Sequence, residues 1–297
     1  MDVDKSISFG PRGVITNDDL EKLSFSDKYE IIETLGKGGF GVVYKVKEKS
    51  SDLIFAAKGF FLHKDSGDSH LYEIRTMREF NGECAGYFKE AFFDTDENRY
   101  YVIMEYLQGI DLKGYKESDK PKDFGFIAPL FEKIYDCLKK FHSIGYVHRD
   151  VKLQNIMFTG DDIKLIDFGL SVKYTSDSKL LRKMAGTPLY MNDLIMPHKL
   201  KTYPKSKLKE IWKFNDMWCL IITFYNLSTG YDIYSKRGGF PELFKRVGKR
   251  QLKLKYDSET IKDQNPLVKL CIRIFRAYVL NEKFDINDMI EAEIKKW

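Results

Sequence analysis

The chain has 297 residues, of which 43% are hydrophobic and 31% are charged, which is the balance of an ordinary globular protein. The 49 basic and 44 acidic residues leave a formal charge of +5, too small an excess to indicate a nucleic-acid-binding protein. No apolar run is long enough to span a membrane, and the polar first ten residues do not have the pattern of a signal peptide.

The four cysteines lie far apart along the chain and form no CxxC pair. This spacing predicts reduced, mostly buried thiols and argues against a disulfide framework or a zinc site. We therefore expect a cytoplasmic or nuclear protein with no membrane span and no nucleic-acid partner.

Residues 1–27 show little periodicity, and we expect them to form a loosely held extension. From Tyr29, short runs rich in apolar and β-branched residues predict three antiparallel strands: YEIIETL, VVYKV and LIFAAK. The segment HLYEIRTMREF has apolar residues at near-helical spacing and predicts a helix. The segments YFKEAFF and RYYVIMEYL predict two further strands.

After Gly109 the pattern changes to long helical segments such as FIAPLFEKIYDCLKKFHSIG and FNDMWCLIITFYNLSTG. These patterns indicate an α+β protein with two lobes. We expect a small β-rich lobe with one main helix over residues 28–107 and a larger helical lobe over residues 108–297.

A cluster of glycines between the first two strands fits the pattern G-x-G-x-x-G-x-V in LGKGGFGVV, residues 35–43. Glycines let a backbone approach a phosphate closely, because no Cβ intervenes. A dinucleotide-binding fold would need a helix after the glycines, whereas VVYKV is a strand, so we place the glycines in a hairpin. A glycine-rich turn without a ligand is the alternative.

Lys58 ends the third strand, and Glu73 lies on the predicted helix fifteen residues later. Each would be a solvated residue if it stood alone. If the two side chains pair, the ammonium group can hold the α- and β-phosphates of a nucleotide.

The segment HRDVKLQN, residues 148–155, carries the strongest chemical signal. Asp150 can accept the proton of an attacking hydroxyl, Lys152 can neutralise a moving phosphoryl group, and Asn155 can ligate a metal ion. Asp167 begins DFG twelve residues after Asn155, and its carboxylate can hold Mg²⁺ on the β- and γ-phosphates.

In this order and spacing, the glycine cluster, FAAK, HRDVKLQN and DFG resemble the eukaryotic-type protein kinase family from about residue 29 to the C-terminus. The resemblance implies a bilobal protein-kinase fold, ATP in the cleft between the lobes, and Mg²⁺. The residues that it assigns to ATP binding are Leu35, Gly36, Lys37, Gly38, Gly39, Phe40, Gly41, Val43, Ala56, Lys58, Glu73, Met104, Glu105, Leu107 and Asp111.

The same resemblance assigns finer roles within these segments. In MEYLQGIDL, Met104 would be the gatekeeper, and the backbone groups of Glu105 and Leu107 would hold adenine. Asp216 in FNDMWCL would anchor the catalytic loop from below. Asn155 and Asp167 would be the metal ligands.

Lys152 and Thr187, in GTPLY, resemble the serine/threonine class of the family. The family pattern predicts that Thr187 forms hydrogen bonds near Asp150 and Lys152 and shapes the hydroxyl site; a turn residue before Pro188 is the alternative. The expected partner is a protein substrate that carries serine or threonine. Two other functions are weighed against this one: a pseudokinase scaffold, which would have lost a catalytic group, and a small-molecule kinase, which would lack the GTPxY loop.

The family pattern breaks where Ala-Pro-Glu should follow GTPLYM, because the chain has Asn192, Asp193 and Leu194 there. Phe284 stands where the arginine partner of that glutamate is expected. Replacing both members of a buried ion pair by apolar side chains is often neutral, so we expect Leu194 and Phe284 to touch. A charged pair made by other residues is the alternative.

Activation is the second departure. The family pattern implies that Arg149 binds a phosphorylated residue of the activation loop. Lys183 occupies a common phosphosite, cannot be phosphorylated there, and would repel Arg149. The hydroxyls of Thr175, Ser176 and Ser178 remain as candidate phosphosites, with an unmodified polar loop as the alternative. A run of lysines after Leu194 is explained by a solvated face, or alternatively by an anion or partner site; these lysines are Lys199, Lys201, Lys205, Lys207, Lys209 and Lys213.

Overall fold

The computed structural model describes residues 20–39, 41–61, 69–80, 82, 84–160, 162–175, 179–233 and 265–297. The chain forms two compact units, one reaching to Gln108 and including Ile166–Gly169, the other made of Gly109–Leu165 and Leu170–Trp297. Each unit is described by itself. In the described part of the chain, no helix has the length and apolar character needed to cross a membrane.

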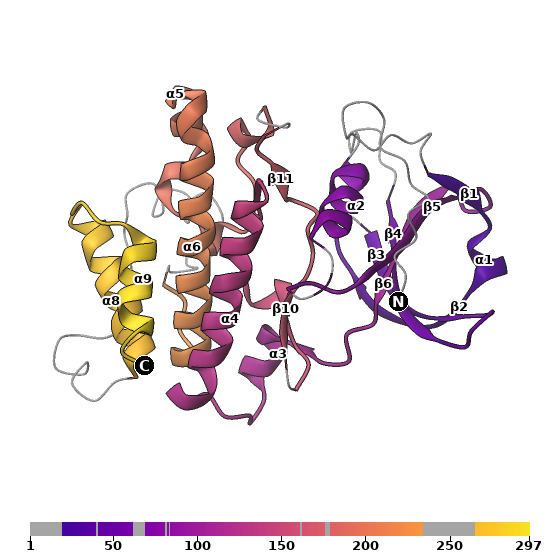
Figure 1. The fold of residues 1–297 in the computed structure, drawn as a ribbon, viewed down its shortest axis with the longest axis horizontal. Helices are drawn as coiled ribbons and strands as arrows, with labels where there is room; N and C mark the ends of the chain where they lie inside the picture. The colour runs from indigo at the N-terminus through magenta and orange to yellow at the C-terminus, as the bar shows by residue number, and fades with distance from the viewer. Residues whose placement is uncertain are drawn as a thin grey trace. The chain divides into compact units, whose positions relative to one another are not determined.

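The first unit is built on a six-stranded sheet with the strand order β1-β5-β6-β4-β3-β2. Its strands are β1 (Glu21–Leu23), β2 (Tyr29–Lys37), β3 (Gly41–Glu48), β4 (Ile54–Phe60), β5 (Phe88–Asp94) and β6 (Arg99–Glu105). β1 pairs with β5 in parallel, and the other neighbours are antiparallel. Helix α2 (Ser69–Glu79) lies beside the sheet (Figure 1). The five predicted strands and the predicted helix are all present.

Part of the predicted extension belongs to this unit. Strand β1 and the short helix α1 (Phe25–Lys28) lie within or overlap residues 1–27, which we expected to be loosely held. Phe25 is buried and stacks on Tyr101 with ring centroids 4.3 Å apart. The expectation is therefore wrong from Leu20 onward, because an aromatic side chain fixes this segment to the sheet core.

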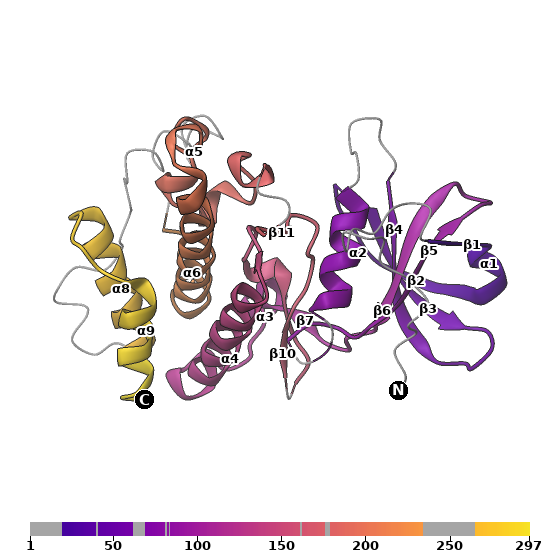
Figure 2. The same cartoon turned by 45° about the horizontal axis from the view of Figure 1, so that its top comes forward.

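The second unit is mostly helical. Its helices are α3 (Leu112–Glu117), α4 (Phe124–Ser143), α5 (Pro197–Thr202), α6 (Lys205–Thr229), α8 (Pro266–Val279) and α9 (Ile286–Ile294). Helix α6 runs between α4 on one side and α8 and α9 on the other (Figures 1 and 2). Residues 215–227 of α6 are all buried, as expected for a helix surrounded by others. The helix ends at Gly230, whose φ of 76° permits the left-handed cap.

Short strands and single turns of 3-10 helix carry the segments between these helices. The strands are β7 (Ile110–Asp111), β8 (Tyr146–Val147), β9 (Ile156–Phe158), β10 (Ile163–Leu165) and β11 (Val172–Lys173). They form a three-stranded sheet, β10-β9-β7, and the pair β11-β8. The 3-10 turns are η2 (Leu153–Asn155), η3 (Leu180–Arg182), η4 (Pro188–Tyr190) and η5 (Asp193–Ile195).

The cysteines differ from the expectation in one respect. Cys219 and Cys271 are free thiols and are buried, as predicted. Cys84 and Cys137 are disulfide-bonded, so the expectation of four reduced thiols is wrong for these two residues. Spacing along the chain is not sufficient to predict a disulfide.

Candidate active site

Lys58 is held between two carboxylates in the first unit. Its Nζ lies 2.5 Å from Glu73 Oε1 and 3.1 Å from Asp167 Oδ1. Strand β4 supplies the lysine and helix α2 supplies Glu73, and both side chains are buried. Phe168, next to Asp167, packs edge-on against Phe80 at the end of α2 with ring centroids 5.9 Å apart. The pairing of Lys58 with Glu73 that the sequence predicts is present.

Two opposing effects act on the charge of Lys58. Burial alone would lower its pKa, because the ammonium ion loses its hydration. The adjacent carboxylates of Glu73 and Asp167 outweigh burial, so the pKa of Lys58 is raised above its ordinary value. A lysine held charged in this way is suited to bind an anionic group such as a phosphate.

The predicted glycine hairpin joins β2 to β3, and the amide of Gly38 donates to the carbonyl of Gly41 at 2.9 Å. A Cβ at Gly41 would lie 2.2 Å from the Gly59 carbonyl oxygen, so strand packing requires this glycine. In contrast, a Cβ at Gly36, Gly38 or Gly39 would meet no atom within 4 Å. These three glycines leave open space above the backbone, as an approaching phosphate needs. Phe40 lies outside the described residues.

The predicted adenine-binding residues lie at the start of β4 and the end of β6. Ala56 is buried and pairs with Met104 across the two strands. The amide of Glu105 donates to the Tyr87 carbonyl at 2.7 Å, so this amide is already engaged within the first unit. Leu107 follows in the segment after β6, half-buried.

Three side chains of the second unit converge as the sequence predicts. The Asp150 carboxylate accepts hydrogen bonds from Lys152 Nζ at 2.6 Å and from Thr187 Oγ1 at 2.7 Å. Lys152 Nζ also donates to Thr187 Oγ1 at 3.0 Å. The Thr187 hydroxyl therefore donates a hydrogen bond to a carboxylate and accepts one from an ammonium group.

Asn155 completes this cluster from the turn η2. Its side-chain nitrogen donates to the Asp150 backbone carbonyl at 2.9 Å and to Asp150 Oδ2 at 3.1 Å. The side-chain oxygen is then the atom that remains for a metal ion, and amide and carboxylate oxygens are ligands that Mg²⁺ prefers. Among the described residues, no group of three His, Cys, Asp or Glu side chains could hold a metal ion.

Asp216 of α6 holds the backbone of His148 and Arg149 in place. Its fully buried carboxylate accepts from the amides of His148 and Arg149, both at 2.8 Å, and lies 2.9 Å from His142 Nε2. Arg149 has a φ of 73°, in the left-handed region that costs a non-glycine residue about 1–3 kcal/mol. The hydrogen bonds to Asp216 hold that conformation, which aims the following Asp150.

Gly186 brings the loop of Thr187 against this same backbone. It has a φ of 108°, and a Cβ there would lie 2.2 Å from the Arg149 carbonyl oxygen. The close approach explains why a glycine precedes Thr187.

Asp111, which the family pattern assigns to ATP binding, has a local structural role. Its carboxylate caps helix α3 by accepting a hydrogen bond from the Gly114 amide at 2.7 Å.

The side chain of Arg149 is already engaged. Its guanidinium donates to the Lys183 carbonyl at 2.6 Å and stacks over the Trp212 ring at 4.6 Å. Burial lowers the pKa of Arg149 to about 10, with the charge of Asp216 opposing this shift, so the group stays charged at neutral pH. The expected repulsion between the two side-chain charges stays a prediction, and the contact that the structure shows is with the backbone oxygen of Lys183. Thr175 is exposed, and Ser176 and Ser178 lie outside the described residues.

Asp193 is a buried acid that stands one position before Leu194, the position at which the family pattern has its glutamate. Asp193 is 1% exposed and accepts a hydrogen bond from the Tyr278 hydroxyl of α8 and forms an ion pair with Lys199 of α5. The expectation that both partners became apolar is therefore wrong. The alternative, a charged pair made by other residues, is what the structure contains.

The predicted contact between Leu194 and Phe284 stays a prediction. Both side chains are half-buried, and the Phe284 ring packs 6.2 Å from the ring of Phe214. Instead, Asn192 joins this segment to α6, since its side-chain nitrogen donates to Asn215 Oδ1 at 3.1 Å. Sequence reasoning missed this network because its members are ordinary polar residues far apart in the chain.

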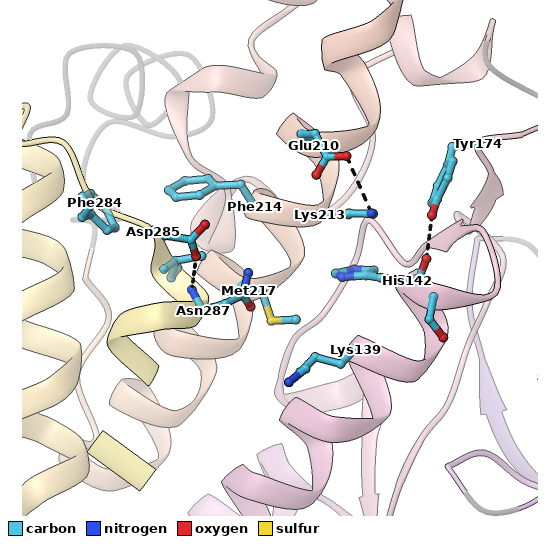
Figure 3. A pocket seen from close by; sticks show the side chains of 12 residues that line it. Lys139, His142, Tyr174, Glu210, Lys213, Phe214, Met217, Phe284, Asp285 and Asn287 are labelled. Carbon is cyan, nitrogen blue, oxygen red and sulfur yellow. Dashed lines mark hydrogen bonds and ion pairs between the residues drawn. The ribbon is translucent and has the colours of Figure 1, made fainter. Parts of the chain in front are cut away.

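A separate pocket of about 690 Å³ lies between α4, α6 and residues 284–287 (Figure 3). Asp150, Lys152 and Thr187 do not line it. One of its lining residues, His142, contacts Asp216, the residue that binds the His148 and Arg149 amides. The side chains that Figure 3 labels around it are Lys139, His142, Tyr174, Glu210, Lys213, Phe214, Met217, Phe284, Asp285 and Asn287.

Comparison with known proteins gives consistent matches. Residues 29–280 match the family model described as "Protein kinase domain". The chain is 30% identical over 191 residues to serine/threonine-protein kinase 10 of Danio rerio, covering 63% of the chain and 19% of that protein. It is 32% identical over 213 residues to NUAK family SNF1-like kinase 2 of Rattus norvegicus, covering 70% of the chain and 32% of that protein.

The fold also matches a solved structure, the twitchin kinase fragment of C. elegans, an autoregulated protein kinase with immunoglobulin domains. The TM-score is 0.70 at 24% identity, over 92% of this chain and 58% of that one. This likeness concerns the fold. The chain spans only about a fifth to a third of the length of the two relatives named above.

Proposed function

The chain belongs to the eukaryotic-type protein kinase family, serine/threonine class, and from this premise we propose that it transfers the γ-phosphoryl group of ATP to a hydroxyl of a protein. The observation that carries the proposal is the hydrogen bond from Thr187 Oγ1 to Asp150 Oδ1 at 2.7 Å, with Lys152 Nζ 3.0 Å from the same hydroxyl. An arrangement that binds one hydroxyl in this way would also suit a substrate hydroxyl, with a carboxylate to receive its proton and an ammonium beside its oxygen.

In the proposed reaction, Asp150 orients the substrate hydroxyl and accepts its proton as the oxygen attacks the γ-phosphorus, while the bond from this phosphorus to the β–γ bridging oxygen breaks and ADP leaves. Lys152 neutralises the charge that develops on the transferred group. Thr187 holds both side chains in register from the neighbouring loop. Asp216 fixes the backbone beneath them, so these groups need little reorganisation during the reaction.

Nucleotide binding is proposed for the residues of the first unit. Lys58, kept charged by Glu73 and Asp167, would contact the α- and β-phosphates. The backbone of Gly36, Gly38 and Gly39 would cover the phosphates. The adenine ring would lie among Leu35, Val43, Ala56 and Met104, with backbone bonds to the Glu105 carbonyl and Leu107, and the ribose would lie near Asp111.

Mg²⁺ is the metal ion that this donor set fits, since carboxylate and amide oxygens are hard ligands. Asp167 and Asn155 would hold it, and when bound it would neutralise charge on the phosphates of the nucleotide. Two protein ligands are sufficient, because Mg²⁺ usually keeps several waters and phosphate oxygens.

The proposal is tested by transfer of label from radiolabelled ATP to generic protein substrates. Replacing Asp150 by Asn keeps the size of the side chain but removes the base, so labelling should fall at least about 100-fold. Thermal unfolding of both proteins controls for loss of fold. Equal labelling by the two would end the kinase proposal and leave a nucleotide-binding scaffold as the alternative.

A further inference from the structure

The positive charge of the chain is concentrated beside the proposed hydroxyl site. Residues 179–210 contain eight Lys and Arg against two Asp and Glu, a formal charge of +6, whereas the whole chain carries +5. The basic residues of this stretch are Lys179, Arg182, Lys183, Lys199, Lys201, Lys205, Lys207 and Lys209.

The fold turns most of these charges to solvent. The apolar residues between them, Leu181, Leu200 and Leu208, are buried together with Trp212 in one cluster. The lysines that alternate with them therefore lie on the outside of η3, α5 and the first turn of α6. We call this surface the basic face: Lys179, Lys183, Lys201, Lys205 and Lys207, all exposed.

The acids of the same stretch do not neutralise the basic face. Asp193 is buried and is already paired with Lys199. Glu210 lies 3.8 Å from Lys209 and 3.7 Å from Lys213, outside the basic face. Across the described ranges, no ion pair joins a lysine of the basic face to an acid. Five unneutralised charges on one surface attract an anionic partner.

One backbone contact ties the basic face to the segment that carries Asp150, and contacts of Arg182 hold the parts of the face together. The Lys183 carbonyl accepts from Arg149, the residue before Asp150, at 2.6 Å. Arg182 Nη1 donates to the carbonyls of Leu200 at 3.0 Å and Lys201 at 3.3 Å, which brings α5 to the same place. Lys183 is therefore held against the backbone segment that carries Asp150 and lies four residues before Thr187, and Lys201 lies beside the neighbouring Arg182.

We propose that the basic face binds acidic groups that flank the acceptor hydroxyl of a protein substrate. This inference rests on the proposed kinase function and specifies its substrate class. The shared chemistry is an anionic oxygen, which a glutamate, an aspartate or an already phosphorylated residue supplies. A protein partner is favoured over nucleic acid, because the surface adjoins a site built to hold a hydroxyl.

The experiment compares serine peptides that differ only in flanking residues: glutamate, phosphoserine, alanine or arginine. An exposed charge pair changes affinity about two- to fivefold, so several flanking acids should raise kcat/KM at least about tenfold over alanine. The glutamate and phosphoserine peptides separate the two sources of negative charge. The preference should weaken with added salt, since the charges are exposed.

The double variant Lys183→Glu and Lys201→Glu should remove the preference for acidic peptides and leave the KM for ATP unchanged. The Lys183 substitution keeps the backbone carbonyl that Arg149 binds. Lys283→Glu is the matched control, an exposed lysine of the same unit outside the basic face, and it should keep the preference. Equal kcat/KM of wild type on glutamate and alanine peptides would overturn the inference and leave the kinase function standing.

A binding arm makes the test independent of turnover. A fluorescent glutamate-rich serine peptide should bind the wild-type chain at least about fivefold more tightly than the double variant. Equal binding by the wild type and the double variant overturns the inference, whether or not any peptide is phosphorylated. Absence of phosphorylation counts separately against the proposed kinase function. Tighter binding of a single-stranded oligonucleotide of the same charge would also overturn it, in favour of nucleic acid.

Discussion

Asp193 carries a buried negative charge that two donors from different helices share, the Tyr278 hydroxyl and the Lys199 ammonium. Replacing Asp193 by Leu strands both donors and should lower the free energy of unfolding by about 3–5 kcal/mol. Tyr278→Phe removes one donor and should cost about 1–3 kcal/mol. Urea unfolding followed by tryptophan fluorescence measures both.

The double variant Asp193→Leu with Tyr278→Phe should be less destabilised than the sum of the two single changes, because the residues share one interaction. Lys201→Met, an exposed lysine of the same helix as Lys199, should change stability by less than about 0.5 kcal/mol. Additive single effects would show that Asp193 and Tyr278 act independently.

The sequence could not show this replacement. Alignment to a motif compares positions, and by position the acid is absent at Leu194. A buried carboxylate needs only donors within reach, and a tyrosine from α8 and a lysine from α5 provide them. By contrast, the convergence of Asp150, Lys152 and Asn155 could be predicted, because these residue types stand at fixed spacing within one short segment.

At the scale of elements, the packing of strand β1 and helix α1 on the sheet depends on the side chain of Phe25. Its ring packs among Tyr29, Phe92 and Tyr101, at centroid distances of 5.7, 6.4 and 4.3 Å. Phe25→Ala should lower the free energy of unfolding by about 3–5 kcal/mol. Chemical denaturation measures this loss, with Ile32→Ala, at an exposed position of β2, as the control. A loss below about 1 kcal/mol would mean that these elements are not part of the folded core.

These two elements were missed for a physical reason. Strand β1 has three residues and α1 has four, which is too short for either periodicity to be visible. Their stability comes from β5, about seventy residues away in sequence, and from one aromatic side chain. The longer strands and helices were predictable because each carries its own repeating apolar pattern.

For the whole molecule, the contacts of the Arg149 side chain predict whether the proposed kinase activity needs phosphorylation of the chain. The guanidinium is buried, bonded to the Lys183 carbonyl and stacked on Trp212. We expect the segment around Lys183 to be ordered without a phosphate, because its arginine partner is already occupied. Protein treated with phosphatase, and shown unmodified by mass spectrometry, should phosphorylate substrate within about twofold of the untreated protein.

The triple variant Thr175→Ala, Ser176→Ala and Ser178→Ala serves as the companion test, because it removes the three candidate phosphosites. Its activity should match that of wild type. A drop of about tenfold or more in either experiment would show that a phosphate competes successfully for Arg149. Contacts of this kind are invisible in sequence, since the acceptor is a backbone oxygen.

That backbone oxygen also decides which substitutions position 183 can tolerate. Every one of the twenty amino acids presents the same carbonyl, so the bond from Arg149 does not depend on the identity of the residue. The side chain of Lys183 is therefore free to vary without loosening the loop. Selection for substrates of a different charge could therefore change the side chain at this position alone. The bond from Arg149 to the backbone, and with it the conformation of the loop, would be kept.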